Sequence, residues 1–272
     1  MNTEKNADLI ETIALRDDAR APTSDTTADS RHYDAYFRID RTDDPATWWA
    51  GAQRVARLVV DDLPATGLDE DLRADLLAGI SRLLLASVSA PAHSGTTMPV
   101  RTPPHGEDGV AARRWKLGHH LFHHMLALMN SHVDAIASAL DESDPVTVGP
   151  LVEELTVLYD SATATMHYAS SFPVSAYAET VRPSMEPPWM PPGFSGMFNR
   201  EHETLLSGLT RLKPRLRGRT ADRSLPADVR AASHALWKAQ SRNRREHKMI
   251  CDRFVPGGGS LLQQHFDETT KG

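Results

Sequence analysis

The stretch VAARRWKLGHHLFHHMLALMNSHVDAIASAL, residues 110–140, decides the fold class of this chain. Its apolar residues recur at three- and four-residue steps, which is the spacing of one face of an α-helix. A long helix with a single apolar stripe buries that stripe against other helices. The stripe comprises Leu117, Leu121, Met125, Leu128, Val133 and Ile136.

The same periodicity predicts further helices over residues 45–62, 68–87, 145–166, 199–212 and 226–254. Two of them begin with an acidic cap followed by proline, at Asp44-Pro45 and at Asp144-Pro145, and proline suits the first helical position. No stretch alternates apolar and polar residues as a surface strand does. We therefore expect an all-α, single-domain helical bundle over residues 31–272, and a disordered or loosely ordered tail over residues 1–30.

Composition excludes several classes of protein. The net charge is −6, and basic residues dominate no long stretch except residues 211–223, so we do not expect bulk binding to nucleic acid. No apolar run reaches 18 residues, so no transmembrane helix is expected, and the first 20 residues lack the apolar core of a signal peptide. The single cysteine suits a reducing cytoplasm. Glycine-rich phosphate loops, nucleophile elbows and paired-cysteine zinc patterns are absent.

A proline-rich band follows the helix that ends near His167. Six of the 18 prolines fall between Pro173 and Pro192, so we do not expect an interior helix there. The band is too rich in aromatic residues and methionine to be a solvated linker, and we interpret it as the wall of a pocket. Arg182 lies inside it, and a cation in apolar surroundings should meet a carboxylate from the protein, a substrate or a cofactor.

Histidine is abundant, with 13 residues, and four of them form the run His119-His120-Leu121-Phe122-His123-His124. His119/His123 and His120/His124 are i, i+4 pairs, each suited to clamping one metal ion. The two pairs point about 100° apart, and no third ligand is evident. One buried pair in hydrogen bonds and one solvated pair is the alternative interpretation.

Three other positions attract attention. His202 follows the good N-cap Asn199 and therefore lies in the first turn of a helix. His247 and Cys251 are four residues apart on the last helix, so imidazole and thiol share one face. His93 lies in a loop of small residues and suits a general base. At each position a structural or surface role remains the alternative.

The segments MHYASSFPVSAY (166–177), RPSM (182–185) and PPWMPPGFSG (187–196) resemble the histidine-ligated, haem-dependent L-tyrosine 3-hydroxylases. These enzymes belong to the haem-dependent aromatic oxygenase group, which includes tryptophan 2,3-dioxygenase. The resemblance covers residues 155–256. It implies an all-α fold around a haem, often a homodimer, and hydroxylation of L-tyrosine to L-DOPA with hydrogen peroxide. The associated pathways make antibiotics of the pyrrolobenzodiazepine and lincosamide type.

The resemblance also implies roles for individual residues. His202 matches the axial ligand of the haem iron, and His93 is placed on the open face as the catalytic base. A relative that acts on 3-methyltyrosine carries its haem on one histidine, a long gap and His-x-x-x-Cys, which His247 and Cys251 also satisfy. Two arrangements stay open: b-type haem on His202 alone, which we favour, or a second ligand at His247 with a single thioether to Cys251.

The remaining expectations concern the substrate. Arg182 is expected to hold a haem propionate or the amino-acid head group, and the residues expected to bind substrate are Ser170, Ser171, Phe172, Trp189 and Phe194. Hydroxylation of 3-methyltyrosine or oxygenation of tryptophan is the nearest alternative activity. A non-haem metal protein built on the His119–His124 run, and a helical interaction protein without a cofactor, are the alternatives from other classes.

Overall fold

The computed structural model describes residues 24–89, 97–99, 109–194, 198–217, 225–255 and 261. Within these residues the all-α prediction is confirmed, since the regular elements are helices apart from two three-residue strands. His93 and residues 1–23 of the expected tail lie outside the described residues. The end of that tail, from Ser24, belongs to helix α2 (Ser24–Phe37).

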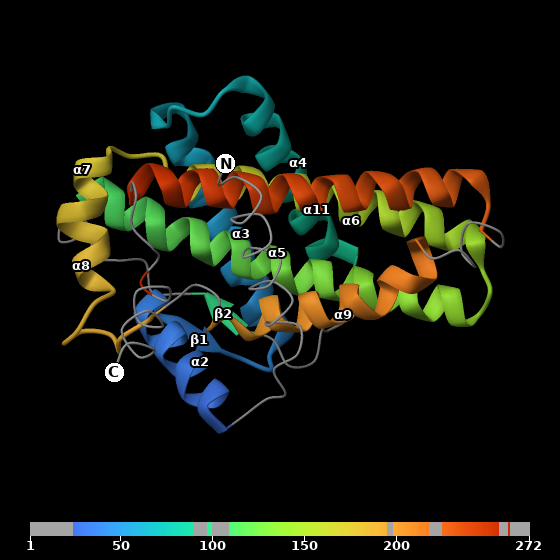
Figure 1. Ribbon diagram of the computed structural model, residues 1–272, viewed down its shortest axis with the longest axis horizontal. Coiled ribbons are helices and arrows are strands. Elements are labelled where there is room, and N and C mark those ends of the chain that lie inside the picture. The colour runs from blue at the N-terminus through green and yellow to red at the C-terminus, as the bar shows by residue number, and fades with distance from the viewer. Residues whose placement is uncertain are drawn as a thin grey trace, which may run out of the picture.

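Three long helices form the body of the molecule: α5 (Gly109–Asp141), α6 (Pro145–Ala169) and α11 (Ala227–Phe254). They run along its long axis (Figure 1). Helix α6 packs against both α5 and α11, while α4 (Glu70–Ser89) covers α6 and α9 (Arg200–Arg217) lies on α5. No helix in the described segments is both long and apolar enough to cross a lipid bilayer.

Local sequence signals explain where several helices begin. Asp44 caps α3 (Pro45–Asp62) and Asp144 caps α6, each accepting a hydrogen bond from a backbone N–H of the first turn. In both helices proline occupies the first position, as predicted, because its missing N–H has no intrahelical partner there anyway. Pro64 ends α3 and lies in the short 3-10 helix η1 (Leu63–Ala65).

Strand β1 (Ile39–Arg41) pairs antiparallel with β2 (Thr97–Pro99), with Ile39 opposite Pro99 and Arg41 opposite Thr97. This ribbon was not predicted, because three residues are too few to show an alternating pattern. It fixes the chain directly after α2.

The proline-rich band is more helical than expected. It contains α7 (Val174–Ala176), the π-helix η2 (Tyr177–Val181) and α8 (Arg182–Ser184) before turning irregular. Pro173 precedes the first of these helices and Pro183 lies in the first turn of the last, where proline costs no hydrogen bond. Helix α9 likewise continues past its expected end at residue 212 to Arg217, with Pro214 in its last turn.

A buried ion cluster joins α3, α5 and α6. Asp62 accepts hydrogen bonds from Arg113, Arg114 and the Tyr168 hydroxyl. Burial alone would raise the pKa of Asp62, but the hydrogen bond and charge of Arg114 outweigh it and the pKa is lowered. Nearby, Gly118 faces Ala169 with no room for a Cβ atom, so α5 and α6 approach closely at this level.

Candidate active site

His202 lies in the first turn of α9, where its backbone N–H donates to Oδ1 of Asn199 at 2.9 Å. Its ring packs over Phe122 of α5, with 6.2 Å between ring centroids. Burial, together with the charges of His247 and Arg244, lowers the pKa of His202 to about 4. The imidazole is therefore neutral at pH 7, which is the form that binds metals, and it remains partly exposed.

His247 on α11 faces the same region. Burial lowers the pKa of both His202 and His119 of α5, and the protonated form of His247 would lower both further. The His247 side chain is exposed, although loss of hydration among its neighbours lowers its own pKa. Three helices thus bring neutral, accessible imidazoles toward one another. We call His119, His202 and His247 the three-histidine site.

His119 is held in one orientation and one tautomer. Its Nδ1–H donates to the backbone carbonyl of Trp115 at 2.7 Å, and its ring stacks on Phe37 with centroids 4.2 Å apart. Burial lowers the pKa of His119 to about 4. Because a carbonyl only accepts, Nδ1 carries the proton and Nε2 presents a free lone pair at pH 7.

Cys251 lies one turn after His247 and is an exposed free thiol. Burial of part of the residue and the charge of Asp252 raise its pKa, while Lys248 lowers it, so the thiol is protonated at pH 7. Burial raises the pKa of Tyr177 of η2, and the thiolate form of Cys251 would raise it further. Tyr177 stacks on Phe254 with centroids 4.4 Å apart and lies 6.1 Å from Trp115. Aromatic rings therefore border the site on the side of Cys251.

The rest of the histidine run is placed differently from the expected pairs. His120 donates from Nε2 to the Phe37 carbonyl at 2.6 Å, and the ring of His124 lies against Trp48. His120, His123 and His124 are all buried, so no pair is solvated as a unit. In the described part of the chain no three His, Cys, Asp or Glu side chains are arranged to hold a metal ion.

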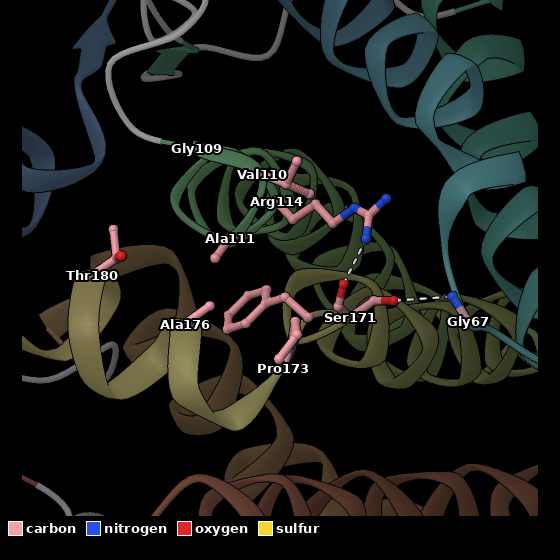
Figure 2. Close-up of a pocket in the computed structure, with 10 residues that line it drawn as sticks. Gly67, Gly109, Val110, Ala111, Arg114, Ser171, Pro173, Ala176 and Thr180 are labelled. Carbon is pink, nitrogen blue, oxygen red and sulfur yellow. Dashed lines mark hydrogen bonds between the residues drawn. The ribbon is translucent and has the colours of Figure 1, made fainter.

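A cavity of about 450 Å³ lies at the N-terminal end of α5 (Figure 2). Ser171 and Phe172, two of the residues expected to bind substrate, line it together with Arg114. Ser171 is engaged on both sides, since its carbonyl accepts from Arg114 and its hydroxyl from the N–H of Gly67. Ser170 is buried and its hydroxyl donates to the carbonyl of His167.

The other expected contacts are spread over the band. Arg182 meets a protein carboxylate, that of Glu186, at 2.9 Å. Phe194 is buried against Tyr36, with ring centroids 5.0 Å apart. Trp189 lies in an exposed turn and is 72% exposed.

A polar network surrounds the start of α9, and it was not predicted from the sequence. Buried Asn199 contacts Nδ1 of His123 through its side-chain nitrogen at 3.2 Å, and Glu201 pairs with Arg41 at 2.7 Å. Arg41 in turn pairs with Asp34. Only the capping potential of Asn199 was visible in the sequence, since Arg41 and Glu201 are far apart along the chain.

Comparison with protein families finds that residues 3–234 match the family described as SfmD 3-methyl-L-tyrosine peroxygenase. No match was found among curated proteins or among solved structures. The matched region includes His202 and the proline-rich band but ends before His247 and Cys251.

Proposed function

The chain belongs to the SfmD 3-methyl-L-tyrosine peroxygenase family, and from that premise we propose that it hydroxylates the ring of L-tyrosine with hydrogen peroxide and a bound haem. Its membership makes it a peroxygenase-type oxidoreductase. The proposal of haem as cofactor and of His202 as its iron ligand rests on one observation. The imidazole of His202 is neutral and partly exposed, and it faces two further histidines.

The residues of the three-histidine site fit a haem. Haem iron can be held by one accessible neutral imidazole, and His202 would supply it from a capped helix turn. The aromatic rings of Trp115, Phe122 and Tyr177 suit a flat apolar macrocycle. Arg182 acts electrostatically on Tyr177 and Arg244 acts on His202, so these two cations are our candidates to meet the propionates.

When bound, the haem supplies activation of the peroxide for transfer of one oxygen atom to the aromatic ring. The overall change joins L-tyrosine and hydrogen peroxide to give L-DOPA and water. The chain contributes orientation and proton handling. His202 would hold the cofactor. Because Nδ1 of His119 donates to the Trp115 carbonyl, Nε2 of His119 would accept a hydrogen bond from a phenol or peroxide. We retain His93 as the catalytic base, by its resemblance alone.

The substrate named in the family description, 3-methyl-L-tyrosine, is the second candidate. It differs from L-tyrosine by one ring methyl group, and a single methyl or methylene in an apolar pocket typically changes kcat/KM by about 10- to 200-fold. The two compounds therefore separate clearly in a competition assay.

The test begins with the absorption spectrum of the purified protein, expressed with ample haem precursor. We expect a Soret band and, with peroxide, a product heavier than the substrate by one oxygen. L-tyrosine, 3-methyl-L-tyrosine and L-tryptophan are offered together. Preference for 3-methyl-L-tyrosine would replace the proposed substrate, and a colourless, inactive protein would refute the haem.

Extraction with acid–acetone decides between the two haem arrangements. We expect the haem to be released, because the raised pKa keeps the Cys251 thiol protonated and the thiolate is the stronger nucleophile. Retention of the haem by the protein, and its release from Cys251→Ala, would establish a thioether instead.

We further propose a cytoplasmic homodimer that serves antibiotic biosynthesis. Light scattering coupled to size-exclusion chromatography measures the assembly directly, and a monomer at micromolar concentration would contradict it.

A further inference from the structure

The first turn of α9 is tied to three other elements at once. Asn199 is buried and its Oδ1 accepts the backbone N–H of His202 at 2.9 Å. This contact fixes the orientation of the amide, so Nδ2 is the atom that faces Nδ1 of His123 at 3.2 Å. An amide nitrogen only donates, so Nδ1 of His123 accepts and neutral His123 carries its proton on Nε2. The Tyr33 hydroxyl of α2 is hydrogen-bonded to the same Asn199 side chain.

Glu201 ties the same turn down a second time. Its carboxylate accepts from Arg41 at 2.7 Å, and Arg41 is held on its other edge by a bidentate contact with Asp34 at 2.6 and 2.9 Å. The backbone carbonyl of Glu201 accepts from Nδ2 of Asn130 at 2.9 Å. The turn is thereby connected to α5, to α2 and to β1.

These contacts exceed what a helix start requires. Asp144 caps α6 with one exposed carboxylate that bonds only its own first turn. Asn199 has the same capping role, but it is buried and its amide reaches His123 on another helix. The difference falls on the one turn that carries the proposed axial ligand.

We propose that Asn199 is a positioning residue for His202, and that Glu201 with Arg41 supports it. Asn199 fixes the backbone of the ligand residue relative to α5, so the direction of the imidazole is set before the cofactor binds. This inference rests on the proposed function, because it assigns His202 to the haem iron.

The experiment compares Asn199→Ala with Asp144→Ala in the full-length protein, by haem titration and by the electron paramagnetic resonance spectrum of the ferric state. Outer-shell partners of metal ligands typically change affinity by about 10- to 100-fold. We expect Asn199→Ala to raise the Kd for haem about tenfold and to change the spin state. Asp144→Ala should lower only the melting temperature.

Hydrogen exchange of the haem-free protein provides a second readout. Amides of residues 200–204 should exchange faster in Asn199→Ala than in the wild type. Asn199→Ser, which keeps a capping oxygen, should recover most of the haem affinity. Glu201→Gln, which keeps the shape and removes the charge, should weaken haem binding by a smaller factor.

Two results overturn the inference in distinguishable ways. If Asn199→Ala and Glu201→Gln lose melting temperature alone, with haem affinity and spin state unchanged, the network is merely structural while the proposed function stands. If His202→Ala binds haem with an unaltered spectrum, His202 is not the iron ligand. The proposed positioning role of Asn199 then fails as well.

Discussion

Helix α5 carries histidines on two sides, and the two sides differ in their exposure. On one side His120 and His124 are sealed into the core beside Phe37 and Trp48. On the other side His119 lies partly exposed opposite His202 and His247. Burial lowers the pKa on both sides. The comparison teaches that a shifted pKa does not mark a functional histidine by itself, because access to a ligand separates the two groups.

The largest expected effect is on cofactor binding. His202→Ala should weaken haem binding by more than the roughly 100-fold upper range of outer-shell changes, because it removes the iron ligand itself. His120→Gln, on the sealed side, should leave the Soret band and the Kd for haem unchanged. Titration with haem measures both variants, and equal affinity would erase the distinction between the two sides.

Acid should destabilise the protein through both sides. His120 has a folded-state pKa of about 3, and His119 and His202 have values of about 4, against 6.5 in the unfolded chain. As the pH falls below 6.5, these histidines become protonated in the unfolded state while they stay neutral in the folded state. Stability is therefore lost toward pH 4, by roughly 1.4 kcal/mol per pH unit for each such histidine.

Urea unfolding of the haem-free protein between pH 7 and pH 4.5 measures this slope. His120→Gln keeps a donor for the Phe37 carbonyl but removes one titrating group, so its slope should be shallower by up to that amount. A slope equal to that of the wild type would show that His120 is protonated in the folded state.

A pair of leucine substitutions sharpens the description of the sealed side. Both ring nitrogens of His124 are buried without a hydrogen-bond partner among the described residues. An unsatisfied buried polar group costs about 1–3 kcal/mol, so His124→Leu should raise the free energy of unfolding by about 1 kcal/mol. His120→Leu should lower it by about 1–3 kcal/mol, because the Phe37 carbonyl then loses its donor. A loss of stability in His124→Leu would mean that its ring has a polar partner.

The smallest effect is expected at Cys251, on the open side. Cys251→Ala should keep the haem and most of the activity, since the proposed cofactor is held without a covalent bond. Mass spectrometry of the intact wild-type protein should give the mass of the chain alone under denaturing conditions. A mass increased by one haem would contradict the expectation.

The helices follow from sequence more readily than the site does. The stripe of α5 and the Asp-Pro starts of α3 and α6 are local signals, so they could be read directly. The ribbon β1–β2 and the helical turns within the proline-rich band could not, because pairing partners and neighbours decide such short elements. At the site, His202, His247 and Cys251 could be nominated by resemblance and spacing. The contacts of Glu201 with Arg41 and of Asn199 with His123 depend on tertiary packing, so no local sequence pattern predicts them.

Gly118 lies directly before His119, at a level where α5 approaches α6 closely. The missing side chain lets α5 pack against Ala169 at the end of α6, directly before Ser170. A methyl group at this position would force the two helices apart without altering any group that we expect to touch haem or substrate. On the proposed function, the spacing between the haem and the residues expected to bind substrate depends on a residue that has no chemistry of its own, and this makes Gly118 a natural first position for enlarging the range of accepted rings.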